Sequence, residues 1–592
     1  MEEACKWGAD FFPLVKDAPK FFGFSDFLAA SALLVLAWTI SGARYQFRLE
    51  TAPFSIFKLS YYSVGFVGLL TLLTDFWRAQ QLCVPKGWLL TPESWQLVLA
   101  SLYFLTFLVW LLFSFIRPLK FCRLNDDRYL EQFKKIIIRG NTSEMAILAE
   151  ELLTSVDNIM HYALIELPPS DPNHDKPYRV TVNASKLLFL ISDPRFCKAL
   201  VANAPDTCIA FFKAVNKLQA FPARMNILAK NIVNEALQNK DSQLYHEQSG
   251  YESGSHGVEK PFSNAIFSKH EMVESFGILF KLDQHKLEQW DARQWEVLIS
   301  VTMQTLEDYV KRAFGNQFNS FDDMSDNIAV ATADLHLINE QADPRVTAEP
   351  LRKARIATQF IDDVLHLFDE HPLAKNAATY IQSAGRPPAN SYIFAGLTTY
   401  YDLLAEMIYT VIIHAAKVQS PVALCDQLHK KIIWRRFFDS ESDFPASSVI
   451  KQWVCAKIID EINLHLHRTT YERAYLLGFC WSVMGIARDQ RAMGNCQTLK
   501  NAVLAWTQKH YLELHCKSPK MAAASLFEGV IFDQARSRLI KPYTLGGLWH
   551  ESERAELKLW LPGMRLQFIS SGRQPYQYWS LRTVADLIQA CE

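Results

Sequence analysis

Three long apolar runs, none of which contains a charged residue, stand out in the N-terminal part of the chain. They cover about 27–43, 59–74 and 95–115. A transmembrane helix needs about 20 mostly apolar residues; the third run meets this length, and the first two reach it with the aromatic residues at their edges. The pattern predicts three transmembrane helices within 27–117, preceded by an interfacial segment over 1–26. Three buried core helices are the alternative interpretation.

Lysine and arginine are unevenly distributed around these runs. The segment before the first run and the loop after the second hold five of them, whereas the loop after the first run and the segment just after the third hold nine. Because cytoplasmic flanks carry the excess of positive charge, we expect the N-terminus outside and the large C-terminal part in the cytoplasm. The bilayer, a plasma or inner membrane, is then the first partner of the chain.

Of the 11 cysteines, Cys5 and Cys83 fall on the outer side in this orientation. Thiols stay reduced in the cytosol, whereas disulfides form in oxidising compartments. We therefore consider a disulfide between Cys5 and Cys83, with two unrelated cysteines as the alternative. The other nine are expected to be reduced thiols.

The apolar runs hold hydroxyl groups but no central acidic or basic residue. Ion-coupled transporters usually carry such charged residues within the bilayer, so that class is disfavoured. The hydroxyl groups fit either helix packing or the lining of a pore that several copies form as a homo-oligomer. In the second and third runs these residues are Tyr61, Tyr62, Ser63, Thr71, Thr74, Tyr103 and Thr106.

Beyond about 118, apolar positions recur with the 3.6-residue period of amphipathic helices. Asn141, followed three residues later by Glu144, caps a helix of about 24 residues that ends at Pro168. We predict an all-α cytoplasmic body, either a bundle or an α-solenoid. Further helices are expected over 267–283, 293–314, 326–341, 351–371, 394–418, 448–466, 498–516 and 519–537.

Polar interruptions suggest how the body is divided. The expected parts are 118–238, a polar loop over 239–264, and helical subdomains over 265–382 and 383–592. Similar apolar segments that begin at 146, 184 and 226 lie about 40 residues apart, close to the period of HEAT or armadillo repeats. An ordinary bundle with similar core faces is the alternative. Such repeats would present a concave surface to a protein partner.

The polar loop contains side chains that are able to recognise a partner. Tyr245, His246 and Tyr251 combine aromatic surface with hydrogen-bonding groups. Long polar loops inside a helical body are often functional, and they also serve as linkers. A recognition loop and a plain linker are therefore both consistent with the sequence.

The composition excludes several classes of protein. Apolar residues make up 49% of the 592 positions, and 61 Lys and Arg balance 62 Asp and Glu, which leaves a net charge of -1. A disordered chain needs low hydrophobicity, and a nucleic-acid binder that relies on bulk charge needs a positive surplus, so nucleic acid is not an expected partner. The sequence also lacks the P-loop, dinucleotide-binding, nucleophile-elbow, zinc-protease and EF-hand signatures. These absences disfavour an enzyme.

One acidic motif could hold a metal ion. Asp322, Asp323 and Asp326 have the form D-D-x-x-D, and on a helix Asp322 and Asp326 share one face, where carboxylates can bind Mg²⁺. The motif resembles the metal site of all-α isoprenoid synthases, which implies Mg²⁺ and a diphosphate. A second acidic pair, Asp362-Asp363, lacks the third acid of that pattern. An acidic helix start, favoured by the helix dipole, is the other interpretation.

A dense basic and aromatic run lies within 429–438. Such a run could contact an anionic membrane leaflet or a phosphate-bearing partner. Its residues are Lys430, Lys431, Trp434, Arg435 and Arg436. Because acidic residues follow at once, a structural helix with basic side chains extended along its surface is the alternative.

These features favour a non-enzymatic integral membrane protein that senses or binds a partner. Its helical body would bind a macromolecule or another signal and act on the membrane helices, as a membrane effector or an oligomeric pore. The layout is similar, in overall plan only, to membrane effectors of bacterial immunity. No cofactor is expected for such a function. The alternative is a membrane-tethered enzyme that uses Asp322, Asp323 and Asp326 with Mg²⁺.

Overall fold

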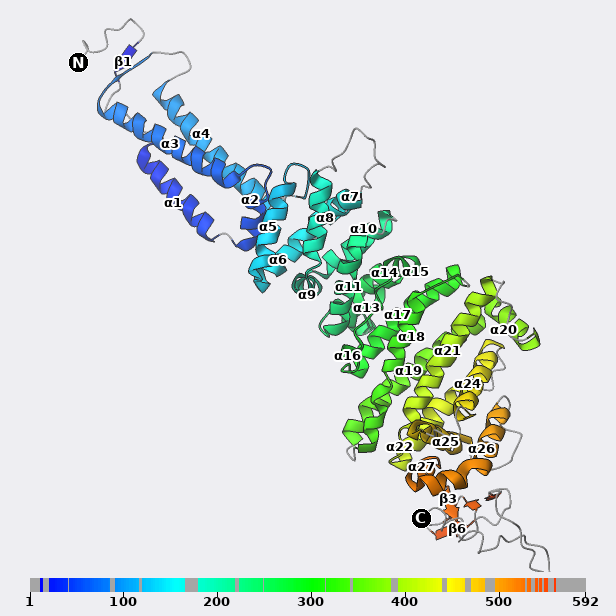
Figure 1. Cartoon of the computed structure of the whole chain (residues 1–592). Helices are drawn as coiled ribbons and strands as arrows, with labels where there is room; N and C mark the ends of the chain where they lie inside the picture. Colours follow the sequence, from blue (N-terminus) through cyan, green and yellow to red (C-terminus); the bar gives the residue numbers. More distant parts are fainter. Residues whose placement is uncertain are drawn as a thin grey trace, which may run out of the picture. The chain divides into compact units, whose positions relative to one another are not determined.

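The computed structural model divides the chain into two compact units, Met1–Ile266 and Phe267–Glu592. Both consist almost entirely of helices (Figure 1), which confirms the all-α class expected from the sequence. The structure describes residues 11–13, 21–40, 42–85, 91–116, 120–164, 179–218, 223–248, 250–314, 316–340, 344–384, 392–438, 445–463, 470–484, 496–526, 530–533, 538–540, 542–545, 548–551 and 558–560.

The first unit begins with apolar helices that lie side by side (Figure 1). These are α1 (Phe24–Ile40), α3 (Ile56–Ala79) and α4 (Pro92–Leu111), which continues into a π-helical turn, η2 (Leu112–Ile116). A short polar helix, α2 (Ala43–Glu50), lies between α1 and α3 in the sequence. Two segments, Ile56–Ala79 and Glu93–Ile116, are long and apolar enough to cross a membrane. Helix α1 has 17 residues, about 25 Å at 1.5 Å per residue, which is short of the roughly 30 Å hydrocarbon core. By length and composition, the described residues thus support two of the three predicted spans.

Most of the surface of these two long helices faces outward. The buried share of the apolar window is 28% in α3 and 17% in the α4 segment. A core helix of a soluble protein would have the opposite profile, and exposed apolar surface of this extent marks contact with a membrane or a partner. The alternative of buried core helices is therefore not supported for α3 and α4. Outward-facing residues include Leu69, Leu72, Phe76, Val98, Phe104 and Leu105.

Helix α1 packs against α3 and α4 through a small buried centre. Phe27, Val67 and Leu99 form this centre. Gly68 permits the close approach of α1, because a Cβ atom at this position would lie 2.6 Å from Cζ of Phe27. The Phe27 ring also meets Tyr103 edge-on, with 5.9 Å between ring centroids. A single glycine therefore sets the distance between α1 and α3.

Two short strands connect the segment before α1 with the connection between α3 and α4. Strand β1 (Phe11–Pro13) pairs antiparallel with β2 (Cys83–Pro85). Nearby, the side-chain oxygen of Gln96 accepts a hydrogen bond from the backbone N–H of Phe21 at 2.8 Å. The residues just before α1 and the connection after α3 are thus neighbours.

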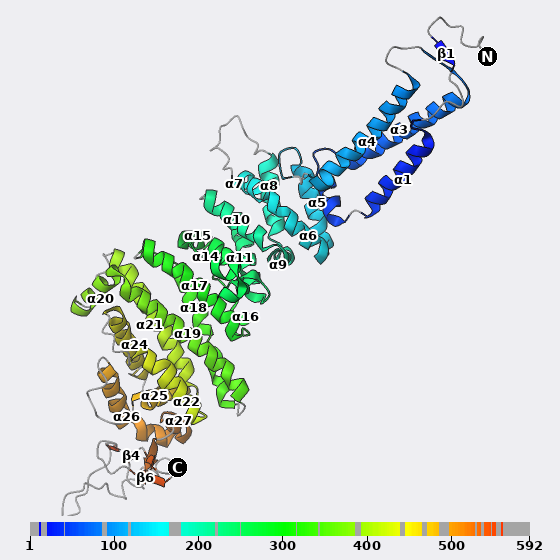
Figure 2. The ribbon, with the colours of Figure 1, turned by 180° about the vertical axis from the view of Figure 1, so that it is seen from behind.

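The rest of the first unit is a stack of helices. These are α5 (Asp126–Arg139), α6 (Thr142–Leu152), α7 (Val156–Leu164), α8 (Arg179–Ile191), α9 (Pro194–Asn203), α10 (Pro205–Leu218) and α11 (Ala223–Gln238). Helix α5 packs on α8, α6 on α9, α7 on α10 and α8 on α11, so each contacts the helix three places further along (Figures 1 and 2).

This order of contacts bears on the three similar sequence segments. Those that begin at 184 and 226 lie in α8 and α11, which stack directly on each other, whereas the segment at 146 lies in α6, which stacks on α9. Three-helix groups stacked in this way are compatible with an armadillo-like solenoid. Membership of a repeat class stays a prediction, and the repeating unit would consist of three helices.

The predicted polar loop over 239–264 is largely helical. It contains α12 (Gln243–Gln248), a 3₁₀ turn, η4 (Gly250–Ser253), α13 (Ser255–Glu259) and the start of α14 (Pro261–Phe267). The buried carboxylate of Glu247 accepts backbone hydrogen bonds from Phe262 at 2.6 Å and Ser263 at 2.9 Å. Such contacts between a side chain and the backbone stabilise a polar stretch without apolar periodicity, which explains why the sequence pattern indicated a loop.

The second unit is also a helical stack. Its elements are α15 (His270–Phe276), α16 (Gln284–Leu287), α17 (Ala292–Ala313), α18 (Ser320–Val330), the 3₁₀ turn η5 (Ala333–Glu340), α19 (Pro344–Glu370), α20 (Pro372–Ala384), α21 (Tyr392–Ala416), α22 (Val422–Asp426), the π-helical η6 (Gln427–Trp434), α23 (Arg435–Phe437), α24 (Pro445–Asn463), α25 (Tyr471–Met484), α26 (Gln497–Lys517) and α27 (Pro519–Ala524). The most extensive contacts join α17 with α19 and α21 with α24. The helices predicted over 293–314, 351–371, 394–418, 448–466 and 498–516 are present, with shifted ends.

The other three predicted helices of this unit are wrong in part. The one over 267–283 breaks at Gly277, whose φ of +60° ends α15. The one over 326–341 is replaced by the end of α18 and the 3₁₀ turn η5. The one over 519–537 ends at Ala524, after which a strand, β3, begins at Ile531.

Short strands lie near the C-terminus of the described chain. β3 (Ile531–Asp533) pairs antiparallel with β4 (Arg538–Ile540), and β4 pairs with β7 (Lys558–Trp560). A separate antiparallel pair is formed by β5 (Pro542–Leu545) and β6 (Leu548–Glu551). Strands of three or four residues are too short to display a two-residue alternation, so the sequence pattern gave no sign of them.

Candidate functional site where the apolar helices meet the body

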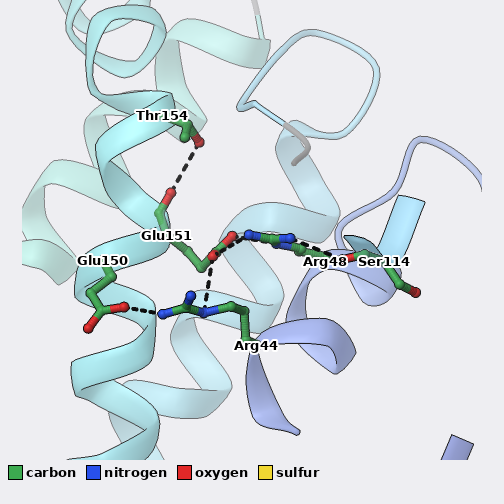
Figure 3. Close-up of polar contacts among 6 residues, drawn as sticks. All are labelled: Arg44, Arg48, Ser114, Glu150, Glu151 and Thr154. Carbon is green, nitrogen blue, oxygen red and sulfur yellow. Dashed lines mark hydrogen bonds and ion pairs between the residues drawn. The ribbon is translucent and has the colours of Figure 1, made fainter. Parts of the chain in front are cut away.

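The short helix α2 joins the apolar helices to the helical body of the first unit (Figure 3). Arg48 on α2 binds Glu151 on α6 through two hydrogen bonds: Nε donates to Oε2 at 2.7 Å, and Nη2 donates to Oε1 at 2.6 Å. The planar guanidinium matches the two carboxylate oxygens, an arrangement that is stronger than a single contact. The exposed fraction is 14% for the Arg48 side chain and 8% for that of Glu151, so water screens this pair weakly.

Arg48 also contacts the end of the second long apolar segment. Its Nη1 atom donates a hydrogen bond to the carbonyl oxygen of Ser114 at 3.0 Å (Figure 3). Ser114 is buried and lies in the turn η2, at a helix end where carbonyl groups lack a partner within the helix. One side chain thus connects α2, the end of the α4 segment and α6.

Arg44 brings a second cation to the same carboxylate. Its Nε atom lies 3.3 Å from Oε1 of Glu151, and its Nη2 atom pairs with Glu150. Arg44 and Arg48 are four residues apart, so they share one face of α2. The outer pair is more exposed, at 38% for Arg44 and 48% for Glu150, and exposed ion pairs contribute little stability.

Aromatic packing fixes α2 on its other side. Phe47 meets Tyr129 on α5 edge-on, with 5.3 Å between ring centroids, and Tyr129 meets Phe121 in the same way at 5.6 Å. All three rings are buried. The neighbouring Arg128 donates from Nη1 to the carbonyl oxygen of Ala52 at 3.0 Å. Both the polar and the apolar faces of α2 therefore bind the body.

The electrostatics of this junction favour permanent charges over proton transfer. The hydrogen bonds to Glu151 raise the pKa of the Arg48 guanidinium above its ordinary value, which is already far above neutral. Removing one partner of a shielded ion pair typically costs about 3–5 kcal/mol, because the other charge is left without compensation. The arrangement is therefore suited to holding elements together and to transmitting a displacement.

Sequence reasoning did not find this junction. Arg44 and Arg48 were counted only among the basic residues that indicate the orientation of the membrane helices. The adjacent Glu150 and Glu151 were not identified as their partners. A signal was present, because two arginines spaced for one helix face lie between apolar runs. The choice of acidic partner, about 100 residues further along, is made by the tertiary fold.

Three threonines of the apolar helices make hydrogen bonds within this group of helices. Thr71 is buried and donates to the carbonyl oxygen of Val67 at 3.0 Å. Oγ1 of Thr74 accepts a hydrogen bond from Nε1 of Trp95 at 3.1 Å, which links α3 to α4. Thr106 donates to a carbonyl oxygen of its own helix at 2.8 Å. These three side chains thus have partners within the helices.

The other hydroxyl residues singled out on α3 and α4 are placed differently. Tyr61 and Tyr62 are 65% and 71% exposed, whereas Ser63 and Tyr103 are half-buried. The two exposed tyrosines therefore face the surroundings of the helix. A pore lining by these residues stays a prediction.

The acidic motif lies at the start of α18. Asp322 and Asp326 are exposed and Asp323 is half-buried. Loss of hydration, followed by the neighbouring Asp326, raises the pKa of Asp322. The helix start itself is occupied by Glu274, which accepts a hydrogen bond from the backbone N–H of Ser320 at 3.0 Å. Across the ranges that the structure describes, no three His, Cys, Asp or Glu side chains are grouped so that they could hold a metal ion.

The basic and aromatic run forms η6 and α23, and much of it faces inward. Trp434 is buried, so it is not available for insertion into a leaflet. Lys430 pairs with an aspartate at 2.7 Å, and Nε of Arg436 lies 4.0 Å from another. Lys431 and Arg435 are exposed. This placement agrees with the structural helix that was the alternative interpretation.

Of the residues of the expected recognition loop, Tyr245 and His246 are described, and they lie in different environments. Tyr245 is buried and donates its hydroxyl to the carbonyl oxygen of Leu237 at 2.6 Å, so it belongs to the core. His246 is exposed, and the side chain of Tyr251 lies outside the described part of the chain. The structure therefore offers no grounds for recognition by Tyr245.

Some cysteines lie outside the described residues. Cys5 and the side chain of Cys83 are among them, so the disulfide between these two cysteines stays a prediction. Cys516 is disulfide-bonded, which corrects the expectation that every cysteine of the body is reduced. Among the described residues, the free cysteines are Cys122, Cys197, Cys208, Cys425, Cys455, Cys480 and Cys496.

Fold and site together define a helical body that a charged junction connects to apolar helices, two of which have the length of membrane spans. Comparison with known proteins gives no match: no protein-family model, no curated protein and no solved structure matches the chain. A functional assignment therefore has to rest on the geometry of the junction.

Proposed function

We propose that this chain is an integral membrane protein whose helical body binds a macromolecule or another signal and acts on the membrane helices. The output would be that of a membrane effector, with a pore formed when several copies assemble. The observation that carries the proposal is the position of Arg48, which binds α6 of the body and the end of the α4 segment at the same time. A displacement of α6 would pull on both contacts.

The outward-facing apolar surface of α3 and α4 supports insertion into a bilayer. A protein in water would expose this surface at a large cost, since about 25 cal/mol is lost for each square ångström of apolar surface left in water. Lipid removes that cost. The backbone of each long helix is hydrogen-bonded internally, which a lipid environment requires.

Contacts at the two ends of the apolar helices support an orientation. Helix α2 binds the body, so the connection between α1 and α3 lies on the same side as the body. Strands β1 and β2 bring the segment before α1 together with the connection between α3 and α4 on the other side. With α3 and α4 crossing, α1 then crosses as well, despite its length. The excess of basic residues on the body side of these helices supports a cytoplasmic body.

The first test asks whether the chain spans the membrane and on which side the body lies. The full chain is expressed in bacterial cells, and inverted inner-membrane vesicles are washed with alkaline carbonate. We expect the chain to stay in the pellet and added protease to remove the body. Release of the chain by carbonate would contradict the proposal, and protection of the body would reverse the orientation.

The second test asks whether the junction transmits a signal. Overproduction of the wild-type chain is expected to permeabilise cells to a membrane-potential dye, and Glu151→Gln to reduce this effect several-fold at equal amounts in the membrane. Glu150→Gln is the matched control, because Glu150 carries the outer and weaker ion pair. Equal permeabilisation by both variants would contradict coupling through Arg48 and Glu151.

A further inference from the structure

A rigid turn leads from the end of the second long apolar segment into the body. In this turn, residues 120–125, the side chain of Asn125 accepts from the backbone N–H of Cys122 at 2.8 Å and donates to the carbonyl oxygen of Lys120 at 3.1 Å. The backbone of Phe121 is held as well, since its N–H donates to Oγ of Ser155 at 3.1 Å. The turn therefore has a fixed shape that is set by polar contacts to its backbone.

The fixed turn presents an apolar side chain together with two basic ones. Leu124 is 75% exposed, although Phe121 three residues earlier is fully buried. Lys120 and Arg123 are both exposed. The guanidinium carbon of Arg123 lies 6.0 Å from the ring centroid of Tyr162, which holds this side chain at the surface of the turn. The turn therefore combines an exposed apolar side chain with two cations, which suits a partner that has an apolar and an anionic surface.

The location of the turn identifies that partner. The last residue of the apolar segment, Ile116, is four residues before Lys120, a separation that spans at most about 14 Å. On the far side of the turn, Arg128 binds the carbonyl oxygen of Ala52, four residues before α3 begins. The turn thus lies near the body-side ends of the two long apolar helices, which under the proposed membrane insertion is the depth of the lipid headgroups.

We infer that the turn 120–125 is a membrane-docking surface, in which Leu124 enters the headgroup region while Lys120 and Arg123 bind anionic phospholipid headgroups. This inference rests on the proposed membrane insertion and adds a lipid specificity to it. Basic residues beside a membrane helix are attracted to the anionic surface of the membrane. Docking of the turn would fix α5, and with it Tyr129 and the α2 junction, relative to the bilayer.

Photo-crosslinking in a reconstituted membrane tests the inference. The full chain, with Leu124→p-benzoylphenylalanine, is reconstituted into vesicles of phosphatidylcholine alone or with about one third phosphatidylglycerol, and lipid adducts are measured by intact mass. Phe189→p-benzoylphenylalanine is the matched control, because Phe189 is 68% exposed on α8, away from the apolar helices. We expect an adduct at position 124 that is several-fold more abundant than at 189 and that increases with phosphatidylglycerol.

Charge reversal separates headgroup recognition from mere proximity. Lys120→Glu combined with Arg123→Glu should lower the adduct yield at position 124 several-fold in the anionic vesicles, whereas Lys186→Glu, an exposed lysine on α8, should not. Equal yields at 124 and 189, or a yield that is insensitive to the charge reversal, would overturn the inference. Release of the chain from the vesicles by alkaline carbonate would overturn the proposed membrane insertion itself, so the two failures are distinguishable.

Discussion

Glu151 illustrates how one residue can determine the stability of a junction. It faces two arginines on α2 and is 8% exposed, whereas Glu150 beside it is 48% exposed. Both are glutamates next to each other on one helix, and their sequence context is almost the same. Their environments differ because α2 covers one of them and leaves the other near water.

Substitution of the two glutamates should therefore have very different effects. Glu151→Gln is expected to lower the free energy of unfolding by about 3–5 kcal/mol, because Arg48 and Arg44 lose the charge that compensates them. Glu150→Gln should cost less than about 1 kcal/mol. Thermal unfolding in detergent, followed by circular dichroism, measures the difference. Similar losses for the two variants would contradict the role assigned to Glu151.

His429 predicts a pH dependence for the second unit. The ring is fully buried, with Nε2 at 2.9 Å from the carbonyl oxygen of Ala415 and Nδ1 at 3.2 Å from Oγ of Ser482. These partners suit the neutral form, in which Nε2–H donates and Nδ1 accepts. Burial lowers the pKa of His429 to about 4, below the roughly 6.5 of an unfolded chain.

The sign of the effect follows from proton binding. Between pH 6.5 and 4 the unfolded chain binds the proton and the folded chain does not, so stability falls as the pH is lowered through this range. His429 contributes at most about 1.4 kcal/mol per pH unit, and His414, whose burial also lowers its pKa to about 4, acts in the same direction. Melting temperatures at pH 7, 6 and 5 should decline, and His429→Gln should flatten the decline. An unchanged slope in that variant would contradict the assignment.

At the scale of elements, the contact between α1 and α3 depends on one glycine. A Cβ atom at Gly68 would lie 2.6 Å from the Phe27 ring, whereas at Gly65, one turn earlier on the same helix, nothing lies within 4 Å. The two positions therefore form a natural pair for testing whether α1 belongs to the packed helical group.

Alanine substitutions should separate packing from helix propensity. Gly65→Ala is expected to stabilise α3 by up to about 1 kcal/mol, the propensity difference between the two residues. Gly68→Ala should destabilise by about 1–3 kcal/mol, since it overpacks the contact with Phe27, and should increase hydrogen exchange in α1. Hydrogen exchange with mass spectrometry provides both measurements. Equal protection of α1 in both variants would mean that it does not pack on α3 at this position.

Long elements with one apolar face could be predicted from the sequence, and short ones could not. Helix α17 (Ala292–Ala313) matches its prediction closely, because its capping box and its apolar stripe agree. The stretch over 239–264 was expected to be a loop, and the strands from β3 onward were not expected at all. Local patterns contain no information about Glu247 as a buried cap, nor about pairing between strands of three or four residues.

At the scale of the whole molecule, the number of copies decides what the apolar helices can do. Two or three helices cannot enclose a pore, and their outward surface is apolar with Tyr61 and Tyr62 exposed. If the proposed pore is correct, light scattering of the detergent-solubilised particle, with the detergent subtracted, should give the mass of several copies. A monomeric particle would contradict a pore, reduce the apolar helices to an anchor and leave the function to the body.

The sequence by itself determined the class of this protein: apolar runs of membrane length followed by an all-α body. Composition and periodicity contain that information because a residue's preference for water or lipid, and for one face of a helix, depends on local spacing. The tertiary structure alone decided that Arg48 meets Glu151 and Ser114, that Tyr245 is core and that Leu124 is exposed. Each of these outcomes depends on which distant surfaces come together, and a contact across about 100 residues has no local signature.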